Sequence, residues 1–382
     1  MEQPEGFPLA PKGKVLRLLK ALYGLKQSGL EWWKTISSSV ESLGFKRLIA
    51  DAGIFIYRHN NTVVVIVVYV DDALFIGNDI TKVLELKKKF MKKWECCDLG
   101  EVKEYLCMSI KKNGSKISLD QMSYLDKVLE RFNITEKPVN TPLPAGYKPS
   151  NNESPVDKQL QNKFQQIIGS LLYIMLGTRP DIAFAVTQLA SHAANPSQDH
   201  YNKALYICRY LLGTRKYSLN FDGKSNKGLE AFVDSDWGSD PKSRRSITDY
   251  FFWLANGIIS WQSKAQKTIA LSSTEAEYMA LSDCSRQAIW ISTLLREIGL
   301  PIKYIPIAGD NQGSIFIASN PVQERRTKHI DIRYHYIRQT IQDGKIKVFF
   351  IDGAENPADM FTKNLAVVKF QKFRSQLGLE FH

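Results

Sequence analysis

Residues 62–79 constrain the fold more than any other part of this 382-residue chain. An apolar, β-branched run over residues 63–70 stops at Asp71 and Asp72, and a second apolar run follows at residues 73–76. Successive Val and Ile residues favour strands, so two short strands around a polar pair predict a hairpin. Adjacent carboxylates repel each other unless a cation lies between them, and a hard divalent ion bound by carboxylates is the simplest such cation. The pair is therefore either a polar turn or a metal-binding tip.

Two motifs in the first third carry a family resemblance. The tetrapeptide YVDD at residues 69–72 resembles the YxDD hairpin of reverse transcriptases, and LYGLKQ at residues 22–27 resembles a segment of Ty1/copia-type retrotransposon Pol polyproteins. In that family the LYGLKQ stretch lies near the incoming nucleotide. The resemblance implies that Asp71 and Asp72 are catalytic metal ligands, and that the nucleic acid contacts are Tyr69, Lys26 and Gln27.

Polymerase chemistry of the two-metal type needs a further carboxylate to clamp both ions. The family supplies it from a strand upstream of its MxQPEGF motif, whereas here no Asp precedes Asp51, which does not match that strand. We therefore expect a partial palm and the start of the thumb at residues 1–135, without the fingers and the first catalytic Asp, and little or no autonomous DNA synthesis. An alternative is an active polymerase that takes the absent Asp from another Pol chain.

The middle of the chain is predicted to be helical. Residues 136–157 contain five prolines without apolar periodicity, which indicates an exposed linker. Two amphipathic blocks follow, and they resemble the thumb and connection helices of copia-type proteins. We expect these elements to fill residues 136–227. The RPD tripeptide at residues 179–181 is interpreted as a capped helix start rather than a catalytic site.

The pattern changes after residue 228 to three strands, a helix, a strand and further helices, which fits a mixed α/β layer. Acidic residues lie at the ends of the strands or the starts of the helices, where one sheet edge would gather them. Taken together, FVDSDW, SSTEAEYMAL, GDNQGS and ENPADMFTK resemble the motifs of the ribonuclease H fold. The resemblance implies a domain at residues 228–366 that binds two Mg²⁺ ions, or Mn²⁺, through Asp234, Glu277, Asp310 and Asp359.

Three choices among these acids need a physical argument. Ser272 and Glu275 fit a capping box, which gives Glu275 a structural role and leaves Glu277 for the metal. Asp234 follows directly from its strand and is preferred to Asp236. Asp331 is a weaker rival to Asp359 as the fourth acid.

Basic residues and composition bear on the partners. The net charge of +12 suits a polyanion, and residues 326–339 mix basic and aromatic side chains on an expected helix. Contacts with the backbone of an RNA–DNA hybrid are expected from Arg326, Lys328 and Arg333. Five widely spaced cysteines without a C-x-x-C motif argue against disulfides or zinc and favour a reducing compartment. No stretch has the length of a membrane span.

The sequence predicts a multidomain chain of α/β and α+β units: a partial palm, thumb and connection helices, a ribonuclease H-like mixed α/β domain, and a C-terminal tail at residues 367–382. The expected activity is Mg²⁺-dependent cleavage of RNA in RNA–DNA hybrids. Template RNA, DNA and other Pol chains are further expected partners, in the cytoplasm or the nucleus. The alternative function is a catalytically inactive, nucleic-acid-binding transposon remnant.

Overall fold

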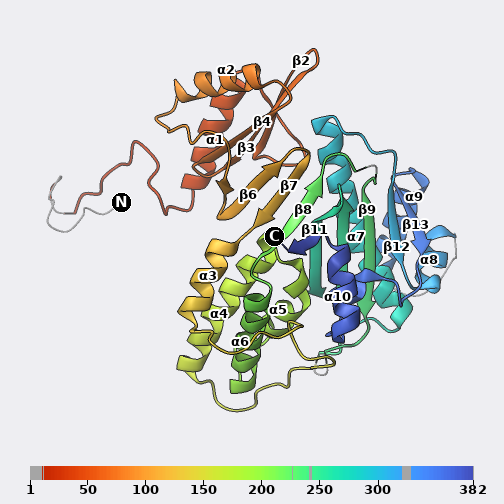
Figure 1. The fold of residues 1–382 in the computed structure, drawn as a ribbon. Coiled ribbons are helices and arrows are strands. Elements are labelled where there is room, and N and C mark those ends of the chain that lie inside the picture. The colour runs from red at the N-terminus through yellow and green to blue at the C-terminus, as the bar shows by residue number, and fades with distance from the viewer. Residues whose placement is uncertain (1–10, 12, 226, 241–242, 321–327, 382) are drawn as a thin grey trace. The chain divides into compact units, whose positions relative to one another are not determined.

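The computed structural model describes residues 11, 13–225, 227–240, 243–320 and 328–381 (Figure 1). The chain divides into two units. The first consists of residues 1–100 with residues 294–300, and the second of residues 101–293 with residues 301–382. No helix in the described part of the chain combines the length and the apolar character needed to cross a bilayer.

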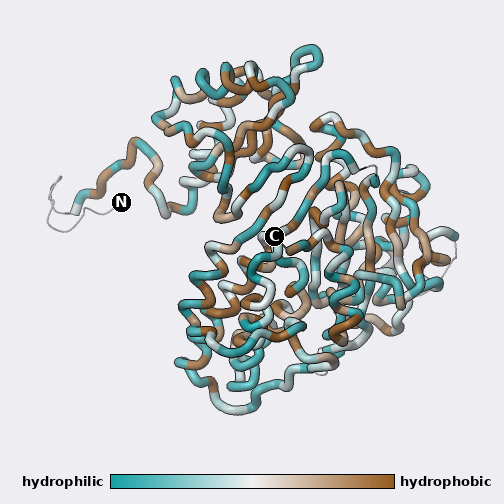
Figure 2. The backbone as a smooth tube through the Cα atoms, in the orientation of Figure 1, coloured by the Kyte–Doolittle hydropathy of each residue, from teal (hydrophilic) through white to brown (hydrophobic). Residues whose placement is uncertain are grey.

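The first unit contains a four-stranded antiparallel sheet and two helices. The strands pair in the order β1 (Lys46–Arg47), β2 (Ile54–His59), β3 (Thr62–Tyr69) and β4 (Asp72–Gly77). The helices are α1 (Ser28–Glu41) and α2 (Ile80–Met91). Val64 and Ile66 alternate along β3 and are fully buried against apolar side chains of both helices. Figure 2 shows this concentration of apolar positions along the strands.

The LYGLKQ segment is not helical. Apolar spacing predicts that residues 15–39 are helical in part, with a break at Gly24, and the structure confirms the helix only after that break, because α1 starts at Ser28. Gly24 has a φ of +90°, a conformation that other residues rarely adopt. Leu19 and Tyr23 are 91% and 101% exposed, so their apolar side chains find no core there.

The second unit begins with a sheet and a helical bundle. The sheet has the order β14-β8-β7-β6-β5, from β14 (Leu379–Phe381), β8 (Tyr217–Asp222), β7 (Lys116–Asp120), β6 (Met108–Asn113) and β5 (Glu104–Tyr105). The bundle consists of α3 (Met122–Arg131), α4 (Lys158–Gly177), η1 (Pro180–Ile182), α5 (Ala183–Ala190) and α6 (Gln198–Gly213). Residues 178–182 behave as a helix start: Pro180 opens η1, and the buried Arg179 guanidinium pairs with Asp181 at 2.8 Å.

The remaining sheet has the order β11-β10-β9-β12-β13. Its strands are β9 (Glu230–Asp236), β10 (Ile247–Leu254), β11 (Gly257–Ala265), β12 (Ile305–Gly309) and β13 (Ile346–Phe350). The first three pair antiparallel, while β12 runs parallel to both β9 and β13. The associated helices are α7 (Ser273–Ile298), α8 (Gln312–Ser319), α9 (Lys328–Gln342) and η2 (Pro357–Phe361). This order and strand direction confirm the mixed α/β domain of the ribonuclease H type.

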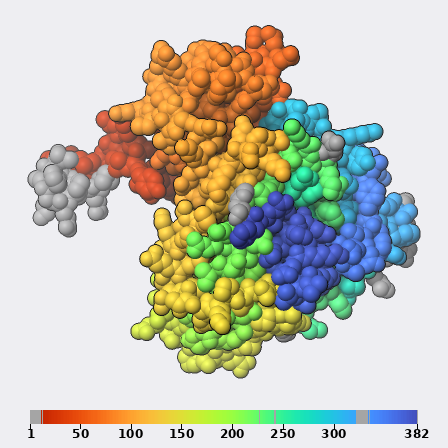
Figure 3. Space-filling view, in the orientation of Figure 1, coloured from red at the N-terminus to blue at the C-terminus, as the bar shows by residue number. Residues whose placement is uncertain are grey.

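The last residues are part of the folded unit. They form α10 (Val367–Gln376) and then β14, which pairs antiparallel with β8. Arg374 of α10 donates to the hydroxyl groups of Tyr210 and Tyr217, each at 3.0 Å. In Figure 3 this dark blue segment lies at the surface beside the green residues of the same unit.

Candidate metal centre

Three aspartates from separate segments converge at one edge of the β9–β12 sheet. Asp234 lies on β9, Asp310 directly follows β12, and Asp359 lies in η2. One carboxylate oxygen from each lies within 4.8 Å of those of the other two. Because β9 and β12 are parallel neighbours, their carboxyl ends share an edge. Asp234 and Asp359 are only 2% and 4% exposed, whereas Asp310 is half-buried.

Glu277 lies beside this group, in the second turn of α7, and is 7% exposed. Burial, followed by the charges of Asp234 and Asp310, raises its pKa to about 10. Glu275, by contrast, forms a capping arrangement: its carboxylate accepts from the N–H of Leu271 at 2.9 Å, and its own N–H donates to Ser272 Oγ at 3.1 Å. The two glutamates therefore have separate surroundings: Glu277 is buried and feels the charges of the acidic cluster without belonging to the three gathered acids, and Glu275 lies at the helix start.

Crowding of carboxylates perturbs the other acids too. Burial raises the pKa of Asp234, and burial together with the Asp234 charge raises the pKa of Asp310 to about 6. A Cβ at Gly353 would lie 2.9 Å from Asp310 Oδ2, so glycine leaves that carboxylate accessible. Negative groups held this closely favour a bound cation.

Two residues that follow Asp359 contact the cluster. Thr362 Oγ1 donates to Asp234 Oδ2 at 2.7 Å. The Lys363 ammonium lies 2.5 Å from Asp359 Oδ1 and 3.5 Å from Asp234 Oδ2. Burial alone would raise the pKa of Asp359, but hydrogen bonds from Lys363 and Lys369 outweigh it and lower that pKa.

Asp249 is a further acid that the sequence did not indicate. It is fully buried on β10 and pairs directly across the sheet with Asp234. Burial, with the charges of Asp234 and Glu277, raises its pKa well above the usual range. Its neighbours on β10 are buried on both faces, so no alternating pattern marked it as inward-facing. Lys363 and Lys369 were also missed, because their spacing in the sequence does not show that their ammonium groups pair with Asp359.

The two rival acids have different outcomes. Asp236 is half-buried, and burial raises its pKa. It is not one of the three aspartates whose carboxylate oxygens lie within 4.8 Å of one another. The side chain of Asp331 lies outside the described residues.

Asn356 is buried and holds η2 beside β9. Its side chain accepts from the N–H of Ala358, which caps η2, and donates to Val233 O at 3.1 Å.

The YVDD motif forms the expected hairpin. Tyr69 pairs with Asp72, so Val70 and Asp71 make the turn, and both aspartates are exposed. Val70 has a φ of +51°, a strained conformation for a β-branched residue, and its carbonyl accepts from Trp32 Nε1 at 2.9 Å. Among the described residues, no third acid, His or Cys gathers with the two aspartates in a metal-binding group.

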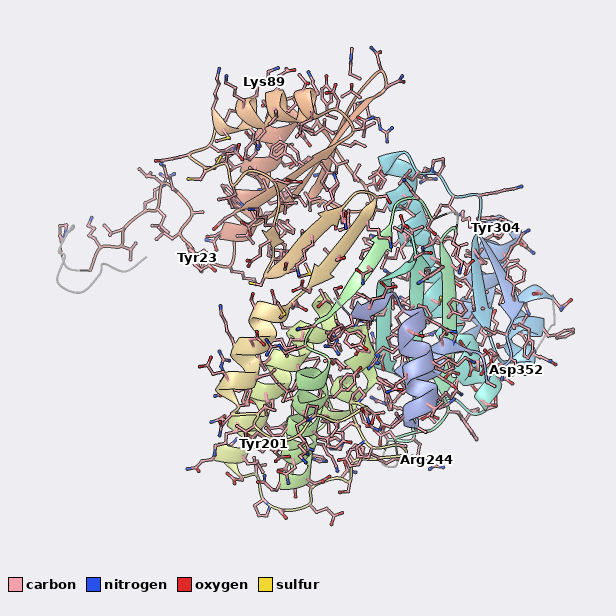
Figure 4. All side chains as sticks on the ribbon, viewed as in Figure 1. Tyr23, Lys89, Tyr201, Arg244, Tyr304 and Asp352 are labelled. Carbon is pink, nitrogen blue, oxygen red and sulfur yellow. The ribbon has the colours of Figure 1, made fainter. Side chains whose placement is uncertain are left out.

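The residues predicted to contact nucleic acid are scattered. Tyr69, Lys26 and Gln27 are exposed in the first unit. Arg333 donates to Met279 O at 3.2 Å. Arg326, and the side chain of Lys328, lie outside the described residues. Figure 4 labels Tyr23, which belongs to the same LYGLKQ motif as Lys26, and Lys89 on α2, whose ammonium pairs with Glu85 at 2.6 Å. None of these contacts tests the predicted roles.

The acidic cluster fits a hard divalent cation. All the candidate donors are carboxylate oxygens, without a histidine or thiolate among the three gathered residues. Oxygen ligands of this kind suit Mg²⁺ and Mn²⁺ and are a poor match for zinc or copper. The raised pKa values show the cost of leaving these charges uncompensated, which a divalent ion would relieve.

Comparisons with known proteins agree with this organisation. Residues 1–145 match the family model described as reverse transcriptase (RNA-dependent DNA polymerase). The chain is 38% identical to the retrovirus-related Pol polyprotein from transposon TNT 1-94 of Nicotiana tabacum, over 99% of this chain but only 29% of that relative. It is 30% identical to the putative transposon Ty5-1 protein YCL074W of Saccharomyces cerevisiae, over 74% of this chain and 93% of that protein.

Among solved structures, LC11-RNase H1 in complex with an RNA/DNA hybrid aligns with 37% of this chain and 97% of its own, at 14% identity and a TM-score of 0.27. The topology described above, rather than this alignment, identifies the ribonuclease H fold. The chain belongs to the Ty1/copia-type retrotransposon Pol polyproteins and comprises a reverse transcriptase region followed by a ribonuclease H-like domain.

Proposed function

We propose that the domain at residues 228–366 hydrolyses RNA in RNA–DNA hybrids with Mg²⁺, or Mn²⁺, as cofactor. The observation that carries the proposal is the convergence of Asp234, Asp310 and Asp359 within 4.8 Å. Glu277 is not one of the three gathered acids, but the charges of Asp234 and Asp310 raise its pKa, and the proposal adds it as a fourth ligand. Bound divalent ions would polarise the scissile phosphate and increase the acidity of the attacking water.

The protein's own contribution is to hold and orient these oxygens. Thr362 and the β9 backbone fix Asp234, and Asn356 holds η2 and hence Asp359 against β9. Glu277 retains its proton near neutral pH because of its raised pKa, so it must release that proton before it can act as a ligand. The burial of Asp234, Glu277 and Asp359 excludes bulk water from most of the cluster.

The proposed substrate follows from family membership and charge. Pol polyproteins that contain a reverse transcriptase region encounter template RNA, DNA and the hybrid between them. The net charge of +12 favours these polyanions. Discrimination of a hybrid from duplex DNA would depend on 2′-hydroxyl groups and on helix shape.

A hybrid-cleavage assay tests the proposal, with a matched pair of glutamates on one helix. Purified protein should cut a hybrid labelled on its RNA strand only when Mg²⁺ is present. Glu277→Gln should reduce the rate by about a hundredfold or more, because it removes a metal ligand. Glu275→Gln, which changes only the helix cap, should retain the rate.

Several results would contradict the assignment. An uncut hybrid at saturating Mg²⁺ would favour the alternative of an inactive, nucleic-acid-binding remnant, provided that the protein still binds the hybrid. Equal losses in the two glutamate variants would point to a general effect on α7. Residual cleavage in the parent protein after EDTA treatment would indicate a contaminating nuclease.

For the reverse transcriptase region we propose that Asp71 and Asp72 bind metal only together with a third carboxylate. Support comes from their exposure at the hairpin tip and from the lack of a gathered third ligand among the described residues. Primer extension by this chain alone should therefore be undetectable. Extension that appears on mixing with another Pol chain, and is lost in Asp71→Asn, would support a shared site.

A further inference from the structure

Lys363 occupies an unusual position for a partly exposed lysine. Its ammonium lies 2.5 Å from Asp359 Oδ1 and 3.5 Å from Asp234 Oδ2, while its side chain is 44% exposed. Asp234 and Asp359 are themselves almost completely buried. The lysine thus reaches from the surface into the cluster and places a positive charge between two of its acids.

Lys369 approaches the same acid from another direction. Its ammonium lies 2.5 Å from Asp359 Oδ2, whereas Lys363 pairs with Oδ1, and within the described part of the chain Lys369 forms no ion pair with Asp234. Lys363 is therefore the cation that bridges two members of the metal-binding group. Burial would lower the pKa of Lys363, but the charge of Asp234 and the hydrogen bond to Asp359 outweigh it, so the ammonium stays charged.

We propose that Lys363 is a built-in counter-ion that a divalent metal must displace from Asp234 and Asp359. This inference rests on the proposed metal-dependent function of the same site. An ammonium this close to Asp359 Oδ1 and Asp234 Oδ2 would repel a divalent ion bound to the same oxygens. The flexible four-carbon stem of lysine, and its exposed path, allow the ammonium to move into solvent when the ion binds.

The position of Lys363 sets the expected direction of the effect. Near neutral pH the ammonium offsets the repulsion among the buried acids, so it stabilises the fold when divalent ions are scarce. The same charge repels an incoming Mg²⁺ and must be moved before the ion is bound. Removing it should therefore strengthen metal binding and weaken the fold in EDTA, two effects of opposite sign from one substitution.

The test is calorimetric titration of the whole chain with Mg²⁺ and, separately, with Mn²⁺. Lys363→Gln should bind either ion about tenfold more tightly or better, since a neighbouring positive charge has been removed. Lys363→Arg, which keeps the charge, should bind within about threefold of the parent. Lys372→Gln is the matched control, because the ammonium of Lys372 pairs with the exposed Glu355 at 2.6 Å and not with the gathered acids among the described residues, and its affinity should equal that of the parent.

Thermal unfolding provides the second readout and guards against a folding defect. In EDTA, Lys363→Gln should melt at a lower temperature than the parent, and saturating Mg²⁺ should abolish the difference. Unchanged or weaker metal affinity in Lys363→Gln, with the fold intact in Mg²⁺, would overturn the inference. So would tighter binding of equal size in the Lys372→Gln control.

The two proposals can fail separately. If the parent binds Mg²⁺ and Lys363→Gln binds it more tightly, but neither cuts the hybrid, the nuclease assignment fails and the counter-ion role stands. If the parent cuts the hybrid and Lys363→Gln shows parental affinity, only the counter-ion role fails. If neither protein binds Mg²⁺ or Mn²⁺, both proposals are overturned.

Discussion

The backbone N–H of Asp234 donates to the carboxylate of Asp249 across the β9–β10 pair, at 3.1 Å. Asp249 Oδ2 is buried and, within the described residues, has no hydrogen-bond partner. One oxygen therefore positions the strand that carries a candidate metal ligand, while the other lies in the acidic cluster without compensation. An unsatisfied buried carboxylate costs free energy of folding.

Replacing Asp249 by asparagine should therefore stabilise the protein. Asn keeps an oxygen that can accept from the Asp234 N–H but carries no charge. At pH 7 in EDTA we expect Asp249→Asn to increase the free energy of unfolding by about 1 kcal/mol or more, measured by urea denaturation. Asp249→Ala removes the acceptor as well and is the control, which should be less stable than Asp249→Asn. Destabilisation by both substitutions to the same extent would contradict this account.

Stability in EDTA should fall as the pH rises from 5 to 9. Glu277 has a folded-state pKa of about 10 and Asp310 one of about 6, both above their ordinary values. In this range these two carboxyl groups bind more protons in the folded state than in the unfolded state, so their contribution to the free energy of unfolding decreases with pH. The lowered pKa of Asp359 changes the free energy of unfolding only at pH values below this range.

The slope contributed by Glu277 approaches about 1.4 kcal/mol per pH unit at most. Glu277→Gln should flatten the dependence, and Glu275→Gln should leave it unchanged. Urea denaturation at five pH values measures both slopes. Stability that is constant or rises with pH in the parent protein would show that these carboxyl groups ionise freely.

The buried ion pair of the helical bundle should be important for folding. Arg179 donates to both oxygens of Asp181, at 2.9 and 2.8 Å, and also to Thr214, and both charged residues are at most 3% exposed. Arg179→Met removes the ion-pair partner of the buried Asp181, which keeps only the hydrogen bond from the Tyr210 hydroxyl at 2.6 Å among its described side-chain hydrogen bonds, and should cost about 3–5 kcal/mol. Lys34→Met, which breaks the exposed pair with Glu31, should cost less than about 1 kcal/mol. Chemical denaturation compares the two variants, and similar losses would contradict the prediction.

The strained hairpin residue offers a stabilising substitution. Val70 adopts a φ of +51° and is 52% exposed, so its side chain adds strain with little burial in return. Val70→Gly should increase the stability of the first unit by about 1 kcal/mol, because glycine adopts this conformation without the Cβ clash. Val64→Gly, in the buried centre of β3, should be strongly destabilising. A loss of stability in Val70→Gly would show that Val70 makes a compensating contact.

Much of the ribonuclease H-like domain follows from local patterns. The strand ending near Asp310 and the long helix from Ser273 are where apolar runs and a capping signal predict them. The capping box also predicted the structural role of Glu275 correctly, because Glu275 forms hydrogen bonds at the start of α7. Strand ends, helix starts and caps depend on residues that are close in the sequence, and they can therefore be predicted from it.

Features that depend on distant contacts were not predictable. Asp249 sits in a strand buried on both faces, where no alternation distinguishes inward from outward positions. Lys363 meets Asp234 only because η2 packs beside β9. The three-residue β14 gains its partner, β8, from far along the chain, and apolar spacing over residues 15–27 had no core to support a helix.

The central claim is that Asp234, Glu277, Asp310 and Asp359 form one divalent-metal centre. Crystals of the chain grown with Mn²⁺ and measured near the manganese absorption edge test it most directly, since the anomalous signal locates the ion. The account predicts a peak bounded by Asp234, Asp310 and Asp359, and its loss in Asp234→Asn. A well-ordered acidic cluster without such a peak at saturating Mn²⁺ would contradict it.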